Sequence, residues 1–401
     1  MAGPLEGVRV LDTTQILSGP FSTMLMADMG ADVIKVERPG MGDPARGNGP
    51  FLGDNNEFST YFMSINRGKR SVCLDLATSK GKELFIELAK NSDVVIENFR
   101  PGAMTRLGLD YDDLKEHNPR LVYASVSGFG QTGPYASRPA LDVIVQGMGG
   151  IMSITGEVGG GPVRVGASVG DITAALFATV AITSALLERE RSGQGQYIDI
   201  SMMDCQAAIM ENAFMRYFAL AETPQRLGTR HPISTPFQAF KSKDGHVVVA
   251  LMGGSTDQWP LFCVAIDHSE LIDDERYATG WLRTQNYDDL IPVLDEAMAQ
   301  KTTAEWVGIM GEFGLPCGPV QDIAQVANDP QMAARGMFID VPHPVLGSVK
   351  MAGNPIKMSR TPTEAKGAPP VLGEHSGDVL SELLGMSQEQ IDALRTEGTI
   401  R

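Results

Sequence analysis

Short runs of β-branched and apolar residues alternate with helical patterns in the first half of the chain. Strands are predicted at residues 7–12, 31–37, 70–76, 93–97, 121–126 and 195–200. Helices are predicted at 19–29 and 79–90, the second of them amphipathic. This alternation is typical of a parallel sheet covered by helices, so we expect an α/β, Rossmann-like large domain. Ligands bind such sheets at the carboxyl ends of the strands, and functional residues are therefore expected in the loops there.

The pattern changes near Pro224, where prolines and a Lys243-Asp244-Gly245 turn precede a further strand at 246–251. Helical patterns follow at 256–265, 287–299 and 303–313, which predicts a smaller α+β domain. We expect residues 1–199 to form the N-terminal part of the large domain and 200–225 a linker. The small domain is expected at 226–325, and 326–401 should return to the large domain with helices near 377–384 and after Ser387.

Asp171 directly precedes the longest apolar run, residues 172–187. This run is shorter than the ~20 residues that span a bilayer, which predicts a buried helix. An aspartate at such a position is commonly an N-cap, because it accepts backbone N–H bonds and is favoured by the helix dipole. The alternative is a nucleophilic carboxylate held on a rigid helix. Position alone does not decide between the two interpretations.

Charge and composition exclude several classes of function. The chain of 401 residues has a net charge of −16, whereas nucleic acids and anionic membranes require a basic surface. The four cysteines and six histidines show no metal-ligand spacing, so we expect neither a metal site nor a disulfide framework. Residues 13–20 lack the Gly-x-Gly-x-x-Gly of dinucleotide-binding proteins. The first residues do not resemble a signal peptide, and we expect a cytoplasmic protein.

Several motifs in order along the chain resemble those of the family III CoA-transferases, which include formyl-CoA transferase and the carnitine and bile-acid enzymes. The motifs are SGP at 18–20, GADVIKVE at 30–37, NRGKRS at 66–71, ENFRPG at 97–102, GFGQTGPY at 128–135, GD at 170–171, ARG at 334–336 and LGEH at 372–375. The resemblance implies a large domain built from both ends of the chain and a small domain from its middle. It also implies a homodimer in which two open rings interlock.

The resemblance implies that CoA passes from an acyl-CoA donor to a carboxylic acid acceptor. CoA is then a substrate and not a permanently bound cofactor. Asp171 matches the family's nucleophile, which forms an anhydride with the donor acyl group and then an aspartyl-CoA thioester. Gln15 and a glycine-rich lid containing Gly253 and Gly254 would complete the catalytic set. The residues that match CoA-binding positions or could assist them are Gln15, Ile16, Arg38, Leu74, Asn98, Phe99, Arg100, Arg106 and Arg138.

Two further residues, Tyr61 and Lys69, are candidates for the same site, but the resemblance supports them less strongly. Tyr61 corresponds to an active-site aromatic residue, although core packing explains it almost equally well. Lys69 is a candidate helper for the CoA phosphates. The Met252-Gly253-Gly254-Ser255 segment has fewer glycines than the lid of formyl-CoA transferase, and this departure argues against oxalate as the acceptor.

Two alternatives remain beside the transferase. An α-methylacyl-CoA racemase needs a histidine directly before Asp142 as one of two bases, but this chain has Leu141 there and no histidine between His117 and His231. A non-catalytic CoA-binding protein would keep the arginines but would not need Asp171. The sequence does not identify the donor and acceptor acids.

Overall fold

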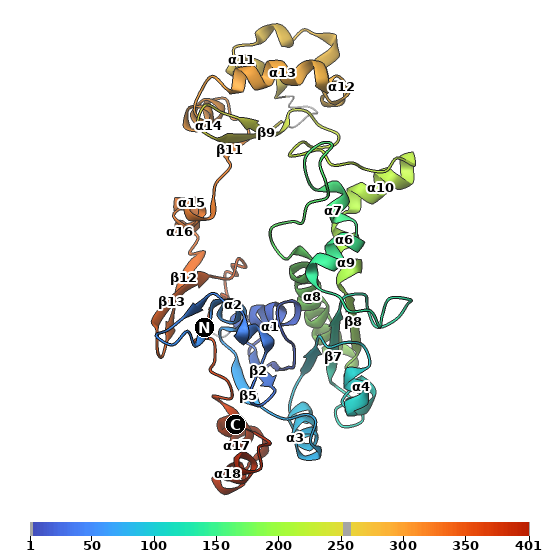
Figure 1. Ribbon diagram of the computed structural model, residues 1–401, viewed down its shortest axis with the longest axis vertical. Helices are drawn as coiled ribbons and strands as arrows, with labels where there is room; N and C mark the ends of the chain where they lie inside the picture. Colours follow the sequence, from blue (N-terminus) through green and yellow to red (C-terminus); the bar gives the residue numbers. More distant parts are fainter. Residues whose placement is uncertain (1–2, 252–257, 401) are drawn as a thin grey trace. The chain divides into compact units, whose positions relative to one another are not determined.

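The computed structural model describes residues 3–251 and 258–400, and these divide into two compact units (Figure 1). The large unit comprises Met1–Ile151, Arg164–Leu220 and Pro330–Arg401, and the small unit comprises Met152–Val163 and Ala221–Asp329. The large unit is therefore assembled from both ends of the chain.

A parallel sheet forms the centre of the large unit. In the described part of the chain it has six strands, in the order β5-β2-β1-β6-β7-β8. They are β1 (Arg9–Asp12), β2 (Asp32–Glu37), β5 (Arg70–Cys73), β6 (Val94–Glu97), β7 (Val122–Ser127) and β8 (Tyr197–Ser201). The predicted α/β class with a parallel sheet is confirmed. Because β1 and β6 are neighbours, the loops that follow them meet at the carboxyl edge of the sheet.

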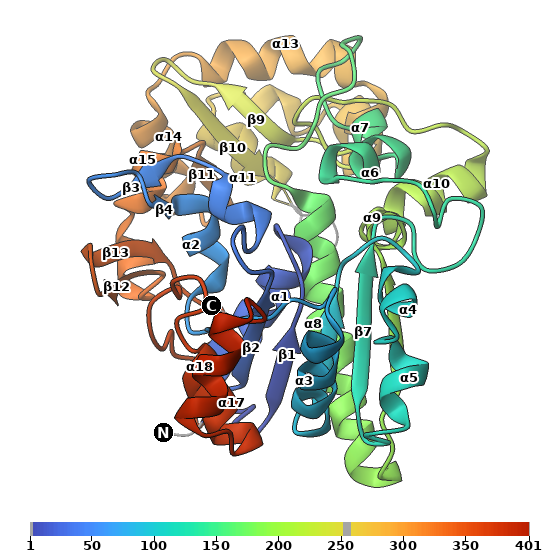
Figure 2. The same cartoon turned by 60° about the horizontal axis from the view of Figure 1, so that its bottom comes forward.

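Helices cover both faces of this sheet, as Figure 2 shows. One apolar core joins the sheet to α3 (Ser79–Lys90), α17 (Ser376–Leu384) and α18 (Gln388–Thr396). The other core joins it to α1 (Ser18–Asp28), α8 (Val169–Ser192) and α9 (Met202–Ile209). The last 26 residues thus contribute to the same core as the first strands, which ties the two ends of the chain together.

Among the described residues, one helix, α8, is long and apolar enough to cross a membrane by length and composition alone. Its mean hydropathy is 1.7. Half of this apolar window is buried within the structure. Ala174, Ala178 and Ile182 are fully buried against the sheet, so the inner face of α8 belongs to the core. This burial accounts for the apolar character of the inner face without a bilayer.

Shorter elements of the large unit border the sheet. They are η1 (Pro44–Gly47), β3 (Phe51–Leu52), β4 (Phe58–Ser59), α2 (Thr60–Asn66), α4 (Ala103–Leu107), α5 (Tyr111–Lys115), α6 (Asp142–Met148), α10 (Glu211–Leu220), α16 (Pro330–Ala334), β12 (Phe338–His343) and β13 (Gly347–Ala352). A short helix, α7 (Ile151–Ile154), lies where the chain enters the small unit.

The small unit has its own sheet and core. Its described strands are β9 (Phe237–Lys241), β10 (His246–Ala250) and β11 (Cys317–Pro319), which form an antiparallel sheet. Its helices are α11 (Trp259–Ala265), η2 (Ser269–Leu271), η3 (Glu275–Tyr277), α12 (Gly280–Gln285), α13 (Tyr287–Met298), α14 (Thr303–Glu312) and α15 (Ile323–Ala327). Trp259, Phe262 and Trp306 are buried at its centre. Gly253 and Gly254 lie outside the described residues, and their predicted role stays a prediction.

Candidate active site

A cavity of about 750 Å³ opens at the carboxyl edge of the large unit's sheet. It is lined by the loops after β1, β6 and β7, the start of α6 and the first turn of α8. Of the residues predicted from the sequence it brings together Gln15, Ile16, Asn98, Phe99, Arg100, Arg138 and Asp171. These residues lie up to 156 positions apart in the sequence, so the fold gathers them.

Asp171 is the third residue of α8 and not its N-cap. The N-cap is Ser168, which makes no side-chain capping bond. Instead, Asp142 from α6 accepts the backbone N–H of Gly170 at its Oδ1, at 2.9 Å. The interpretation of Asp171 as a structural cap is therefore wrong, because another helix supplies a carboxylate to the first turn of α8.

The surroundings of Asp171 disfavour its charged form. Burial, followed by the nearby carboxylate of Asp142, raises the pKa of Asp171 to about 7, while a hydrogen bond with Ser18 acts in the opposite direction. No described cation forms an ion pair with Asp171. A position near a helix N-terminus would by itself lower the pKa, so burial outweighs the helix dipole here. A poorly solvated carboxylate is more nucleophilic than a solvated one.

Asp142 is itself firmly held. Its Oδ2 accepts a hydrogen bond from Gln146 Nε2 at 2.8 Å and pairs with Arg164 Nη2 at 3.3 Å. Gln146 Oε1 accepts the N–H of Val165 at 2.9 Å, which fixes the loop that leads into α8. No motif in the sequence indicated a role for Asp142 in this site. Only the packing of α6 against α8 brings it next to Asp171.

Asn98 fixes the loop that carries Gln15. Its side-chain amide accepts the backbone N–H of Gln15 at Oδ1 (2.7 Å) and donates from Nδ2 to the carbonyl oxygen of Gln15 (2.7 Å). Nδ2 also lies 3.3 Å from Ser18 Oγ, and Ser18 hydrogen-bonds Asp171. Asn98 therefore connects the loop after β6 to the loop after β1 and, through Ser18, to Asp171.

Ile16 adopts a backbone conformation that β-branched residues rarely occupy, with φ of 66°. Its N–H donates to Asp43 Oδ1 at 3.0 Å. Asp43 forms a buried ion pair with Lys35 at 2.9 Å, and Lys35 Nζ donates to the carbonyl oxygen of Thr14 at 2.8 Å. This buried pair contacts the loop on both sides of Gln15 and holds the strained residue in place.

A second buried ion pair lies beneath the same loop. Lys69 Nζ donates to Asp12 Oδ2 (3.0 Å), the carbonyl oxygen of Pro20 (2.9 Å) and Asn66 Oδ1 (2.8 Å), which satisfies all three of its protons. Burial lowers the pKa of Lys69 to about 8. Lys69 has no solvent-exposed side-chain surface, so it is a structural cation and not the phosphate helper expected from the sequence.

Three predicted CoA-binding residues do not line the cavity. Arg38 and Arg106 are exposed, and neither forms an ion pair with a described residue. Leu74 is 1% exposed and packs into the core, so its side chain is not a surface that an adenine ring can cover in this structure. Tyr61 lies close enough to Asp171 to be affected by its charge, and burial together with Asp171 raises the pKa of Tyr61 to about 12.

Within the described residues, no group of three or more metal-ligating side chains is close enough to hold a metal ion. The cavity presents a partly buried carboxylate, a fixed glutamine and two arginines. Such a set can carry out acyl transfer, in which a carboxylate attacks an activated carbonyl and cations hold an anionic substrate.

Comparisons with known proteins agree with this chemistry. The sequence profile of CoA-transferase family III matches residues 5–376. The chain is 38% identical to succinyl-CoA:glutarate CoA-transferase of Mus musculus, over 99% of this chain and 90% of that protein. It is 43% identical to acetyl-CoA:oxalate CoA-transferase of Acetobacter aceti, over 92% of each.

A solved structure of a CAIB/BAIF family protein from Brucella suis superimposes with a TM-score of 0.84 at 39% identity. The match covers 96% of this chain and all of that one. Sequence and fold therefore agree over almost the whole length. The chain belongs to CoA-transferase family III and is a CoA-transferase.

Proposed function

We propose that this protein transfers CoA between two carboxylic acids through covalent intermediates on Asp171. The observation that carries the proposal is the state of Asp171, a carboxylate with a raised pKa that pairs with no cation of the described residues and lines a cavity large enough for the reacting end of an acyl-CoA. Asp142 caps α8, so Asp171 has no capping role to fulfil.

In the first half-reaction, a carboxylate oxygen of Asp171 attacks the thioester carbonyl carbon of the donor. The carbon–sulfur bond breaks, CoA leaves as thiolate, and a mixed anhydride remains. The thiolate then attacks the aspartyl carbonyl carbon, which releases the donor acid as a carboxylate and leaves an aspartyl-CoA thioester. The acceptor carboxylate runs the same two steps in reverse, forming its own acyl-CoA and regenerating Asp171.

The surrounding residues have distinct proposed tasks. Gln15 lies in a loop fixed by Asn98 and the Lys35–Asp43 pair, and its side chain is the proposed donor to the oxyanion that develops on the attacked carbonyl. Phe99, Arg100 and Arg138 line the cavity as contacts for CoA or for the acid. Arg38 and Arg106 are exposed cations that remain available for the CoA phosphates.

We place short dicarboxylates among the acids that this enzyme accepts. The mouse relative is named for succinyl-CoA and glutarate, and the Acetobacter relative for acetyl-CoA and oxalate. Arg100 and Arg138 supply two cations at the cavity, which suits an acid with a second carboxylate that must be held while the first one reacts. Succinyl-CoA with glutarate is therefore the first pair to test.

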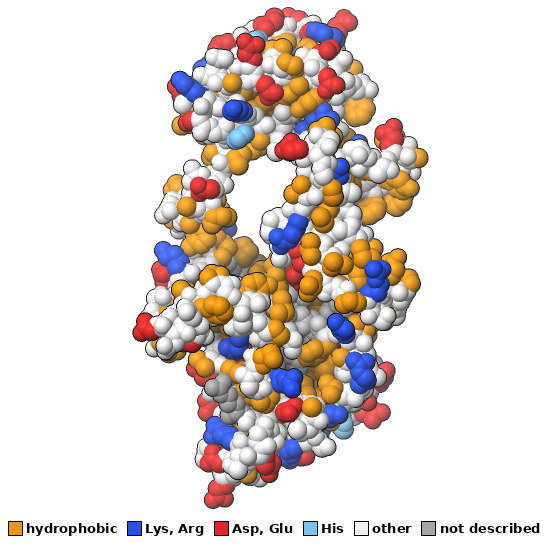
Figure 3. Space-filling view, viewed as in Figure 1, with side chains coloured by type: hydrophobic (Ala, Val, Ile, Leu, Met, Phe, Trp, Pro, Cys, Tyr) orange, Lys and Arg blue, Asp and Glu red, His pale blue; other side chains and the backbone are white. Residues whose placement is uncertain are grey.

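The large unit also supports the proposal of a homodimer, which the family resemblance describes as interlocked. Helix α10 has no buried residue although it carries Phe214, Met215, Phe218 and Leu220, which are between 37% and 70% exposed. Apolar side chains gather over this helix in Figure 3. The outer face of α8 exposes further apolar residues, among them Val180. Surfaces of this kind mark protein contacts, and a second copy of the chain is the proposed partner.

The decisive experiment is to trap the intermediate. The protein is incubated with succinyl-CoA and then with hydroxylamine, and peptides that contain Asp171 are examined by mass spectrometry. A hydroxamate on Asp171 is expected, because hydroxylamine attacks both an anhydride and a thioester. The Asp171→Asn variant serves as the control and should carry no modification. Exchange of the α-proton with deuterium, without any label on Asp171, would instead indicate racemase chemistry.

A further inference from the structure

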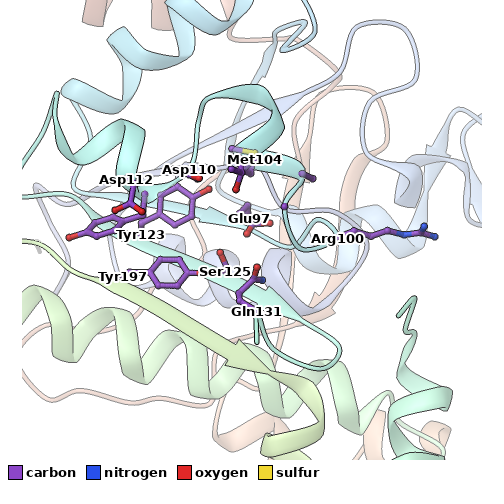
Figure 4. A pocket seen from close by; sticks show the side chains of 13 residues that line it. Glu97, Arg100, Met104, Asp110, Asp112, Tyr123, Ser125, Gln131 and Tyr197 are labelled. Carbon is purple, nitrogen blue, oxygen red and sulfur yellow. The ribbon is translucent and has the colours of Figure 1, made fainter. Parts of the chain in front are cut away.

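A second cavity of about 270 Å³ lies between the strands β6, β7 and β8 and the helices α4 and α5 (Figure 4). It does not include Asp171, Gln15 or Asn98, and it shares only Arg100 with the cavity at Asp171. The transferase reaction proposed above uses none of its other lining residues. The side chains that line it determine which ligand it can recognise.

Three tyrosine rings form one wall. The ring centroids of Tyr111, Tyr123 and Tyr197 lie 5.8–6.3 Å from one another. The hydroxyl groups of Tyr111 and Tyr123 donate to the carbonyl oxygens of Gly195 and Leu109, so these hydroxyls are already engaged. What the tyrosines offer a ligand is therefore mainly their rings, whose faces attract cations.

The charged groups of this cavity are mostly negative. Glu97, Asp110 and Asp112 line it, and Arg100 is the single lysine or arginine among the described lining residues. Figure 4 shows the side chain of Arg100 extending away from the other labelled side chains. Asp110 caps α5 through the backbone N–H of Asp113, and Asp112 pairs with Lys115 at 2.5 Å. Glu97 is the most deeply buried of the three carboxylates and pairs with no described cation.

Glu97 is 5% exposed, and its hydrogen-bond donors among the described residues are neutral. Its Oε2 accepts the backbone N–H of Phe99 at 2.7 Å, and the hydroxyl of Ser125 also bonds it. Burial, with a smaller contribution from Asp199 on β8, raises the pKa of Glu97 to about 7. A cation in the cavity would compensate this charge.

A buried hydrogen-bond donor also lacks a partner here. Gln131 Nε2 is inaccessible to solvent and donates to no acceptor in the part of the chain that the structure describes, although the backbone N–H of the same residue donates to Asp199 Oδ2 at 2.9 Å. Gln131 lines the cavity close to Glu97 and Ser125 (Figure 4). A buried amide without an acceptor is costly, so a ligand oxygen that accepts from it would be favoured.

From these groups we propose that the cavity binds a small organic ammonium compound that also carries a hydroxyl or carbonyl oxygen. The ammonium group meets Glu97 and the tyrosine rings, and the oxygen accepts from Gln131 Nε2. A neutral molecule would leave Glu97 uncompensated, and an anion would be repelled by the three carboxylates. This site is separate from the transferase reaction and stands or falls independently of it.

The test is calorimetric titration of the CoA-free protein with 4-amino-1-butanol, butylamine and 1,4-butanediol. These probes share a four-carbon chain but differ in the ammonium and hydroxyl groups. The amino alcohol is expected to bind once per chain, butylamine more weakly because it cannot accept from Gln131, and the diol not at all. Equal binding of the diol, or no binding of the amino alcohol, would overturn the proposal.

Two variants locate the site. Glu97→Gln should weaken binding of the amino alcohol by about tenfold or more, whereas Glu116→Gln removes an equal charge from the exposed end of α5 and should change nothing. Tyr197→Ala provides a second test on the edge strand β8, where a folding defect is less expected than at a central strand. Unchanged affinity in both Glu97→Gln and Tyr197→Ala would contradict the assignment.

The affinity should also depend on pH, because ammonium binding requires ionised Glu97. Its pKa of about 7 means that binding should be stronger at about pH 8 than at about pH 6. The other titratable or charged groups around Glu97 are Asp199 and Tyr197 on β8, Tyr123 on β7, Asp110, Tyr111 and Asp112 at α5, and Arg100. In Glu97→Gln this difference between the two pH values should disappear, and its persistence would assign the dependence to another group.

Discussion

Asp12 and Asp171 are both shielded from water near the carboxyl edge of the same sheet, but the charges beside them have opposite signs. Burial alone would raise the pKa of either. At Asp12, the ammonium groups of Lys69 and Lys35 reverse this effect and hold the pKa well below its usual range. At Asp171 the carboxylate of Asp142 adds to the effect of burial, and the pKa rises to about 7. The residue type is the same, and the neighbouring charge determines the outcome.

This comparison separates two uses of buried charge. Asp12, with Lys69, Thr14 and Thr23, forms a fully bonded network that fixes the loop carrying Gln15. Asp171 is left without a cation and is therefore a costly but reactive group. Stability is expected to depend on the first carboxylate and chemistry on the second. Each prediction below tests this division.

Replacing the nucleophile should have the largest effect. Asp171→Asn should lower kcat by a factor on the order of 10⁴ or more, because the covalent route is lost while substrate binding remains. The same variant should be more stable at pH 8 by about 1–3 kcal/mol, since it removes a partly exposed carboxylate whose charging opposes folding. Steady-state kinetics and urea denaturation measure the two effects. A stable variant with near-normal kcat would refute the assignment of Asp171.

Breaking the buried pair should chiefly affect stability. Asp12→Ala leaves Lys69 buried without its counter-ion, which should cost about 3–5 kcal/mol in the free energy of unfolding. The double variant Asp12→Leu with Lys69→Met should lose much less, because neither charge remains unpaired. Asp392→Ala, which loses exposed contacts with Arg395 and Gln388, is the control and should change stability by about 1 kcal/mol or less. Equal losses in the single and double variants would contradict this account.

The pH profile should show opposite trends for activity and for stability. Asp171 must be ionised to attack, so kcat/KM should rise with pH and level off above about pH 7. Its folded-state pKa lies above the ordinary value of 3.8, so the folded protein binds more protons and its stability falls as pH rises from about 4 to about 7. This fall should be smaller in Asp171→Asn. A fall of the same size in that variant would point to other groups.

The smallest effect is expected at Ser18. Ser18→Ala removes the hydrogen bond that lowers the pKa of Asp171, so the rise in kcat/KM should move to higher pH. The activity at pH 7 should fall by a few-fold, on the scale of about one hydrogen bond to a charged group. Ser22→Ala is the matched control, because Ser22 lies on the same helix and its hydroxyl bonds Thr179 instead of Asp171. A shift in the control as large as in Ser18→Ala would indicate a general effect on α1.

Much of the fold followed from hydrophobic periodicity. All six predicted strands of the large domain occur in the parallel sheet, and the helix predicted at 79–90 has the same bounds in the structure. Periodicity is informative for these elements because each combines a strong local hydrophobic pattern with burial. The short hairpin of β3 and β4 was not predicted, because two-residue strands carry no periodic signal.

The sequence predicted which side chains belong to the candidate site, but not which of them contact one another. Gln15, Asn98 and Asp171 were identified through family motifs, but nothing in the sequence placed Asp142 beside Asp171 or showed that it caps α8. Lys69 was misjudged because lysines are usually exposed, and its burial depends on Asp12, 57 residues away. Pairings between distant elements arise from tertiary packing, and a sequence pattern does not record them.

The capping of α8 by Asp142 also bears on how this chain could change over evolutionary time. Residue 171 makes no bond that its helix requires, so a single substitution there should abolish the proposed chemistry while the helix, the cavity and the exposed arginines remain. A duplicated gene could thus drift from an enzyme to a carrier that sequesters acyl-CoA without passing through an unfolded intermediate. Because Asp142 and not Asp171 bonds the first turn of α8, the proposed catalytic position can be exchanged without loss of that bond.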